Sequence, residues 1–313
     1  MSAFLGFDTS NYTTSASLYN AEQNFVRHER RLLDVPDGAL GLRQSDAHFQ
    51  HVKRLPDVLA RLLGPEGERG VAAVGASTRP REAEGSYMPC FLAGESQARV
   101  TAAVLGVPFY AFSHQQGHLA AAAFSAGRPE LLRCPFLGLH LSGGTTELLH
   151  VTPGEDGIPR AETIGGSSDL AAGQLIDRLG KRLSLPFPSG KQIDALAERA
   201  EKQSRMTPKA DGLRFSLSGL ENRVDDLLKQ GESPETAAHF ILASIAAGLS
   251  NALSAALAAY GALPVLVSGG VAANTLISRE LKEKFQATFG APEFSTDNAA
   301  GVAYLTYLRH SEN

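Results

Sequence analysis

Two short apolar segments of this chain begin almost identically, 132 residues apart. FLGFDTSNYTTSASLY starts at Phe4 and FLGLHLSGGTTELLHV starts at Phe136, and their residues coincide at six of the first eleven positions. Each segment predicts a strand, a tight turn of small and hydroxyl residues, and a second strand. Two unrelated hairpins can share such a start by chance, so the order of the flanking segments must decide whether the chain is duplicated.

The pattern of apolar positions after each hairpin predicts the same succession of elements. After the first hairpin we expect a strand at 24–30, an amphipathic helix at 42–63, a strand at 71–76, a helix at 91–105 and a strand at 107–111. After the second we expect a strand at 162–164, helices within 169–204 and 233–260, a strand at 264–268, a helix from about 274, a short strand at 292–295 and a last helix at 298–309.

This order predicts an α/β protein with two lobes, 1–133 and 134–313, and leaves open whether the last helix packs back on the first lobe. Three strands followed by helix–strand–helix–strand, twice, are typical of the duplicated ribonuclease-H-like lobes of actins, sugar kinases and chaperone ATPases. A doubly wound sheet also alternates strands and helices. The two leading hairpins argue against it, because a doubly wound sheet needs a crossover helix after its first strand.

The most apolar stretch, 240–260, predicts a buried helix rather than a membrane span. Its large apolar residues recur every three to four positions, and Ser244, Ser250, Asn251 and Ser254 interrupt it. The net charge of −4 and a pI near 6.1 exclude a bulk polyanion binder, so a nucleic-acid partner would need a local basic patch or a second subunit.

The cysteines and the first residues predict a cytoplasmic protein. Cys90 and Cys134 form no CxxC pair and cannot make a disulfide framework, which suits a reducing compartment. The opening MSAFLGFDTS lacks the charged and apolar regions of a signal peptide. We therefore expect no membrane association.

The glycine-rich turns predict a nucleotide-binding site in the cleft that we expect between the two lobes. Gly143 and Gly144 let the backbone of the second hairpin approach phosphate oxygens, and neighbouring hydroxyls add donors. Gly269 and Gly270 end the strand at 264–268 and open a helix, as at many nucleotide-binding edges. A glycine pair alone would also serve only to end a strand.

Candidate metal ligands begin with His114 and His118 in the sequence SHQQGH. In a helix these imidazoles lie one turn apart on one face, which suits two ligands of one ion, although paired histidines also occur on ordinary surfaces and in cores. His140 lies beside the second glycine turn, and Asp297 precedes the last helix, where it would also serve as an N-cap. Three imidazoles and a carboxylate form a set suited to iron or zinc. No Glu follows His114, so a zinc-protease site is disfavoured.

Several segments, in this order and near this spacing, resemble the tRNA threonylcarbamoyladenosine transferases, the TsaD-type proteins once labelled sialoglycoprotein endopeptidases. The segments are SHQQGHLAAA, LHLSGGTTELLHV, DLAAGQLIDRLGKRLSLPFPSG, FSLSGLENRV, VLVSGGVAAN and STDNAAGVAY. The resemblance covers nearly the whole chain, from Gly6 to Tyr304. It implies a transferase that moves a threonylcarbamoyl group from threonylcarbamoyl-adenylate to N6 of the adenosine next to a tRNA anticodon, with ATP or an AMP-containing adenylate as ligand.

The resemblance also implies roles for individual residues and for partners. His114 and His118 match the metal pair and Asp297 the distal carboxylate ligand of one divalent ion, iron or zinc. A direct ligand role for His140 is an extrapolation, because some members place a metal-contacting tyrosine there. Family members work with a smaller homologous subunit and an ATPase subunit.

The remaining candidate residues form two groups. The catalytic candidates in the first turn are Asp8, Ser10 and Asn11. The candidates that contact nucleotide and substrate are Leu141, Ser142, Gly143, Gly144, Thr145, Asp177, Gly190, Gly269, Gly270 and Asn274. Within this group, Asp177 and Gly190 resemble the ribose-holding positions and Asn274 the adenine side; Asp177 would otherwise be a solvated helix acid.

Departures from the family pattern concentrate where the acceptor would bind. The acidic opening turn of the family has become Asn11-Tyr12-Thr13, the run at 173–178 has lost a Glu, and a GPG-like segment is replaced by a loop containing Arg79 and Arg81. These arginines would face an anion or simply be solvated. The differences leave two alternatives open: carbamoyl-type transfer to another acceptor, and a nucleotide-binding partner protein without turnover. A tRNA acceptor would need basic side chains near the predicted cleft, and the candidates are Lys53, Arg54, Arg178, Lys181 and Arg182.

Overall fold

The computed structural model describes residues 2–10, 12–35, 42–65, 70–294 and 298–312, and it separates the chain into two compact units. Unit 1 contains Met1–Cys134, Thr152–Ala161 and Glu293–Asn313, and unit 2 contains Pro135–Val151 and Glu162–Pro292. The predicted boundary lies close to the first division, but 152–161 and 293–313 belong to unit 1 rather than to the second lobe. The last helix therefore completes the first unit.

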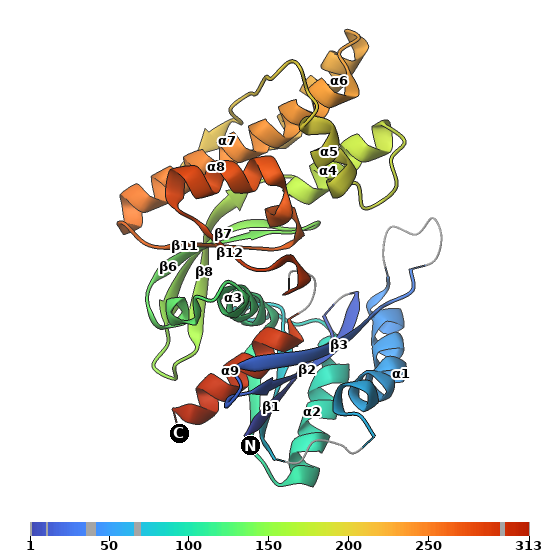
Figure 1. Cartoon of the computed structure of the whole chain (residues 1–313), viewed down its shortest axis with the longest axis vertical. Helices are drawn as coiled ribbons and strands as arrows, with labels where there is room; N and C mark the ends of the chain where they lie inside the picture. The colour runs from blue at the N-terminus through green and yellow to red at the C-terminus, as the bar shows by residue number, and fades with distance from the viewer. Residues whose placement is uncertain (1, 11, 36–41, 66–69, 295–297, 313) are drawn as a thin grey trace. The chain divides into compact units, whose positions relative to one another are not determined.

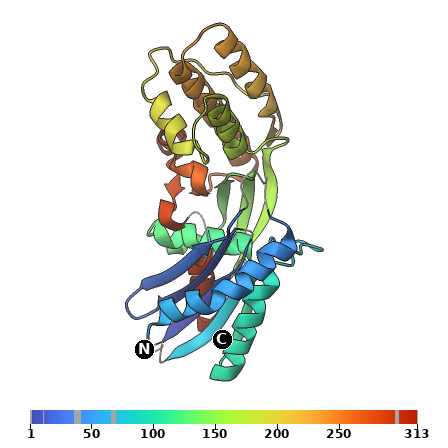
Figure 2. The same cartoon turned by 90° about the vertical axis from the view of Figure 1, so that its right-hand side faces the viewer.

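Unit 1 is built on a five-stranded sheet with the order β3-β2-β1-β4-β5 (Figure 1). The strands are β1 (Ala3–Asp8), β2 (Thr13–Asn20), β3 (Phe25–Leu32), β4 (Val71–Arg79) and β5 (Phe109–Ser113). β1 pairs antiparallel with β2 and parallel with β4. Two helices, α1 (Gln44–Leu63) and α2 (Phe91–Leu105), cover one face, and α3 (His114–Ser125) and α9 (Ala299–Ser311) cover the other (Figures 1 and 2).

Aromatic packing explains why α9 joins unit 1. Tyr304 of α9 meets Tyr19 of β2 edge-on, with ring centroids 5.1 Å apart, and Phe124 of α3 lies 5.1 Å from Tyr304. Burial, together with the neighbouring Tyr304 and Tyr307, raises the pKa of Tyr19 to about 12. Such pairs favour tilted or edge-to-face geometry and add to the burial of apolar surface.

Unit 2 repeats the strand arrangement of unit 1. Its sheet has the order β12-β11-β6-β7-β8-β10-β9, so β8-β7-β6-β11-β12 corresponds to β3-β2-β1-β4-β5. β6 pairs antiparallel with β7 and parallel with β11, as β1 does with β2 and β4. The strands are β6 (Phe136–Leu141), β7 (Thr146–Pro153), β8 (Pro159–Ser167), β9 (Ala210–Asp211), β10 (Arg214–Phe215), β11 (Val265–Ser268) and β12 (Thr288–Phe289). The predicted duplication is present in the sheet topology.

The core of unit 2 lies between this sheet and five helices, with α7 at its centre. The helices are α4 (Ala172–Arg182), α5 (Gly190–Ala197), α6 (Ser218–Lys229), α7 (Pro234–Tyr260) and α8 (Thr275–Phe285). α7 is long and apolar enough to cross a membrane, but 78% of its most apolar window is buried inside the protein. This burial agrees with the predicted core helix.

One of the predicted elements was wrong. The expected strand at 292–295 is a short 3-10 helix, Pro292–Phe294, and the strand of that region is β12. Pro292 explains the difference, because proline has no N–H to donate to a strand ladder. The helices expected within 169–204 are α4 and α5, which are separated by 183–189, where Pro186 and Pro188 interrupt the helix pattern.

Candidate functional site

Asp8 and His114 lie together at the carboxyl ends of β1 and β5. Asp8 is fully buried, and its Oδ2 lies 2.8 Å from Nδ1 of His114. Oδ1 of Asp8 accepts a hydrogen bond of 2.9 Å from the N–H of Ser10, the buried second candidate of the first turn. The two groups are 106 positions apart in the sequence, and parallel strands bring them to one edge of the sheet.

His114 and His118 lie on the same side of α3, as the spacing predicts. Their ring centroids are 4.6 Å apart, and the His114 side chain is 23% exposed. Ser113 caps the helix by accepting from the N–H of Gln116, whose side chain in turn accepts from the N–H of Ser113. Gln116 was not among the predicted site residues, although Ser-x-x-Gln is a recognisable capping signal.

Asn298 approaches the same histidine from the start of α9. Its Nδ2 donates to the backbone carbonyl of His114 at 3.1 Å and also lies 2.7 Å from His114 Nδ1. Its Oδ1 is buried without a hydrogen-bond partner among the described residues. Asn298 was not among the predicted site residues, because a residue that follows a candidate ligand and precedes a helix looks like an ordinary helix start.

Close contact between α3 and α9 depends on glycine. A Cβ on Gly117, the residue before His118, would lie 2.9 Å from the Cβ of Asn298. A Cβ on Gly301 would lie 1.9 Å from the carbonyl oxygen of Gly117. The glycine of HQQGH therefore gives α9 and Asn298 access to the histidine pair.

The donors around His114 and His118 fit a divalent metal ion in part. Two imidazoles on one helix face suit iron or zinc, and the buried, unpaired Oδ1 of Asn298 adds an oxygen beside them. Across the described part of the chain, however, no group of three or more His, Cys, Asp or Glu side chains is arranged to hold an ion. The predicted ligand Asp297 and the catalytic candidate Asn11 lie outside the described residues, and His140 belongs to unit 2.

The glycine turn of the second hairpin is open at its tip. The N–H of Ser142 donates to the carbonyl of Thr145 at 2.8 Å, which closes the turn. Gly143 and Gly144 are exposed, and nothing lies within 4 Å of the positions of their absent Cβ atoms. Such a turn has room for phosphate oxygens next to its backbone.

The second glycine pair lies against this hairpin. Gly269 has a φ of +95°, and a Cβ there would meet the carbonyl oxygen of Leu141 at 2.3 Å. Only glycine fits this position, whereas Gly270 faces open space. His140 Nδ1 lies 3.0 Å from Oγ of Ser268, the residue before the pair.

Two predicted nucleotide residues also hold the local backbone. Asp177 Oδ1 accepts from the N–H of Ser189 at 2.8 Å, which brings Asp177 next to Gly190. Asn274 caps α8 by accepting from the N–H of Ile277, and its Nδ2 donates to Asp194 at 2.7 Å. The predicted contacts of Asp177, Gly190 and Asn274 with ribose and adenine remain predictions.

Asp169, which sequence analysis did not select, organises the start of α4. Its carboxylate accepts from the Ser216 hydroxyl at 2.6 Å and from the N–H groups of Leu217 and Leu170. Burial favours the neutral acid, but the hydrogen bonds from Ser216, Ser218, Leu217 and Leu170 outweigh it and hold the pKa of Asp169 below its usual range. Its position at the head of DLAAG was the available signal.

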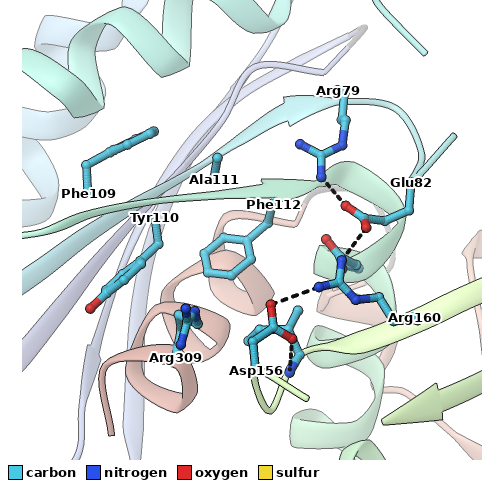
Figure 3. Close-up of a pocket in the computed structure, with 11 residues that line it drawn as sticks. Arg79, Glu82, Phe109, Tyr110, Ala111, Phe112, Asp156, Arg160 and Arg309 are labelled. Atoms are coloured by element: carbon cyan, nitrogen blue, oxygen red, sulfur yellow. Dashed lines mark hydrogen bonds and ion pairs between the residues drawn. The ribbon is translucent and has the colours of Figure 1, made fainter. Parts of the chain in front are cut away.

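Arg79, one of the two arginines in the loop that replaces the GPG-like segment, is engaged in an ion pair. It lies in a cavity of about 270 Å³ in unit 1, where it forms an ion pair with Glu82 (Figure 3). Glu82 also pairs with Arg160, which reaches Asp156 at 2.8 Å. These carboxylates neutralise Arg79 and Arg160, so the two guanidinium groups tie the loop to the turn between β7 and β8 instead of facing an anion.

Several candidate basic residues for tRNA are likewise engaged. Arg178 and Arg182 both pair with Glu221 at 2.7 Å. Arg54 pairs with Asp34 at 2.5 Å, and Lys53 lies over the ring of Phe49. Exposed pairs of this kind contribute little to stability but reduce the positive potential available to phosphates.

Comparisons with known proteins identify the family. The model of the TsaD family, described as tRNA N6-adenosine threonylcarbamoyltransferase, matches residues 41–304. The chain belongs to the TsaD family. It is 32% identical to the tRNA N6-adenosine threonylcarbamoyltransferases of two strains of Thermus thermophilus, over 98% of this chain and 92% and 91% of the relatives. The resemblance found in the sequence is thus confirmed, as is the expectation of a transferase.

Solved structures with low sequence identity share the fold of this TsaD family member. Component A of (R)-2-hydroxyglutaryl-CoA dehydratase from Acidaminococcus fermentans has a TM-score of 0.59 at 16% identity, over 100% of this chain and 99% of that chain. HypF of T. kodakarensis has a TM-score of 0.60 at 13% identity, over 99% of this chain and 48% of its own. The predicted fold class of duplicated ribonuclease-H-like lobes is confirmed.

Proposed function

We propose that this chain transfers a threonylcarbamoyl group from threonylcarbamoyl-adenylate to N6 of the adenosine next to the anticodon of a tRNA. The observation that carries the proposal is the match to the TsaD family over 41–304, with relatives of that name aligned along nearly their whole length. In the reaction, N6 forms a bond to the carbamoyl carbon and the bond from that carbon to the phosphate oxygen breaks. AMP leaves, and N6 loses a proton.

Unit 2 would bind the adenylate. The open turn at Gly143 and Gly144 would receive the phosphate through backbone N–H groups, supported by the close packing of Gly269 against Leu141. Asp177 would hold the ribose hydroxyls next to Gly190, since a carboxylate accepts strong hydrogen bonds from hydroxyl groups. ATP would occupy the same residues through its AMP part.

Unit 1 would supply the metal site. His114 and His118, with Asp297 as the third ligand, would hold one iron or zinc ion. When bound, such an ion supplies Lewis-acid polarisation of a carbonyl. Asp8 and Asn298 hold His114 in place, and Ser10 and Asn11 would act on the acceptor.

The altered first turn favours a second candidate function. Tyr12 and Thr13 stand where the family resemblance leads us to expect acidic residues, and Thr13 is buried at the start of β2. A turn without these carboxylates would suit carbamoyl-type transfer to an acceptor other than tRNA. We also propose that the chain works in the cytoplasm with a smaller homologous subunit and an ATPase subunit.

A transfer assay tests both candidates. Purified protein is mixed with radiolabelled threonylcarbamoyl-adenylate and unmodified tRNA, with and without the partner subunits, and metal content is measured in parallel. Label in tRNA that is lost with His114→Ala supports the proposed function. Bound metal without labelled tRNA, even with partner subunits present, overturns it and directs the search to other acceptors.

A further inference from the structure

We infer that Asp8 is a positioning residue that sets the tautomer of His114 and thereby the affinity of the histidine pair for a divalent metal ion. The inference rests on the proposed function only in taking a divalent ion as the ligand of His114 and His118. Its observations are the contacts of Asp8 and Asn298 with one imidazole and the hydrogen bond from the Ser10 N–H to Asp8, all within unit 1.

The contacts place the hydrogen of the neutral His114 ring on Nδ1. A neutral imidazole has one N–H and one lone pair. Nδ1 lies 2.8 Å from Asp8 Oδ2 and 2.7 Å from Asn298 Nδ2, so it cannot donate to the first and accept from the second at once. A carboxylate facing a ring lone pair would be repulsive, whereas Asn298 Nδ2 has other acceptors, the His114 carbonyl at 3.1 Å and the lone pair on Nε2 at 3.3 Å. The ring therefore donates to Asp8 and keeps its lone pair on Nε2.

This tautomer is the one that a metal ion requires of His114 Nε2. An imidazole nitrogen binds a metal through its lone pair, and a carboxylate on the other nitrogen fixes the ring orientation and raises its basicity. Asp8 is suited to this role because it is fully buried and held by the N–H of Ser10.

The Ser10 contact makes the substitution Asp8→Asn unusually informative. The N–H of Ser10 requires an acceptor at the Oδ1 position, so the new amide must place its oxygen there and its NH₂ group toward His114 Nδ1. The ring must then accept at Nδ1 and carry its hydrogen on Nε2. A substitution that hardly changes shape thus exchanges the tautomer and occupies the nitrogen that would bind the ion.

The test uses the full chain without added metal and then with Zn²⁺ alone. In protein labelled with ¹⁵N at histidine, ring spectra recorded at alkaline pH report which nitrogen carries hydrogen, and His114→Gln assigns the signals. We expect hydrogen on Nδ1 in the wild type and on Nε2 in Asp8→Asn. Zn²⁺ affinity, measured by chelator competition, should fall about 10- to 100-fold in Asp8→Asn, and Asp8→Glu should restore part of it.

Two controls and two outcomes decide the matter. Asp156→Asn changes a carboxylate of unit 1 that pairs with Arg160 rather than with a histidine and should leave Zn²⁺ affinity unchanged. Thermal unfolding shows whether each variant is folded. Hydrogen on Nε2 of His114 in the wild type, or a folded Asp8→Asn protein with wild-type Zn²⁺ affinity, would overturn the inference. Because neither readout involves transfer, failure of the tRNA assay with intact Zn²⁺ binding would count against the proposed function alone.

Discussion

The contact between α3 and α9 at Gly117 and Gly301 makes a sharp prediction about stability. In Gly301→Ala the new methyl carbon would begin 1.9 Å from the carbonyl oxygen of Gly117 and 2.8 Å from the backbone nitrogen of Ala121. Ordinary contact begins near 3.4 Å, so the two backbones must separate by about 1.5 Å. Neither contact can be relieved by turning a side chain.

Overpacking of this kind typically costs about 1–3 kcal/mol, and we expect Gly301→Ala near the upper end because both opposing atoms are backbone. For a unit of this size the fall in Tm should be on the order of 5–10 °C. The separation of α9 from α3 should also move Asn298 away from His114, so Zn²⁺ affinity should decrease with stability.

The tyrosines make unit 1 measurable by itself. The chain contains no tryptophan, and six of its seven tyrosines belong to unit 1. Tyrosine fluorescence during urea unfolding therefore follows that unit. Gly219→Ala in α6 is the matched control, because open space surrounds its Cβ position and alanine favours a helix. A Gly301→Ala protein with the same unfolding midpoint and Zn²⁺ affinity as the wild type would refute the reasoning.

Two further predictions concern unit 2. The pKa of Asp169 is lowered in the folded protein, so the stability that this carboxylate contributes is present above the ordinary pKa of 3.8 and is lost as the pH falls through the folded-state pKa. Asp169→Asn should therefore flatten the pH dependence of the free energy of unfolding below about pH 4, measured by urea unfolding with far-UV circular dichroism. An unchanged slope would contradict this prediction. Asn274→Ala removes the cap of α8 and should lower the free energy of unfolding by about 0.5–2 kcal/mol. Calorimetry of ATP binding then tests the adenine contact, since a variant that loses stability but binds ATP normally has only the capping role.

The fold was accessible from the sequence because each lobe repeats one order of elements. The 132-residue offset relates β1 to β6, and the two sheets share their central strand order. The helix at 91–105 was predicted with its observed ends, where the apolar pattern is bounded by proline before and glycine after. The elements at 210–229 were not predicted, since two-residue strands such as β9 and β10 have too short a pattern to detect.

The site was accessible only where its residues are neighbours in sequence. His114 and His118 follow from helical spacing, and the glycine turn at 142–145 follows from its composition. Asp8 and Asn298 meet His114 across 106 and 184 positions, and no local pattern encodes such contacts. Asn274 was predicted from the resemblance as a nucleotide contact, but its capping of α8 already accounts for the position of its side chain. Its place in the fold therefore gives no separate indication of a ligand.

The return of the chain to unit 1 links these observations. If α9 had completed unit 2, Asn298 would belong to a different unit from α3, which carries the two histidines. Instead Tyr304 and Gly301 pack α9 against β2 and α3. Asn298, which directly precedes α9, therefore contacts His114. The glycine of HQQGH therefore influences the surroundings of the histidine pair as well as the packing of α3 against α9.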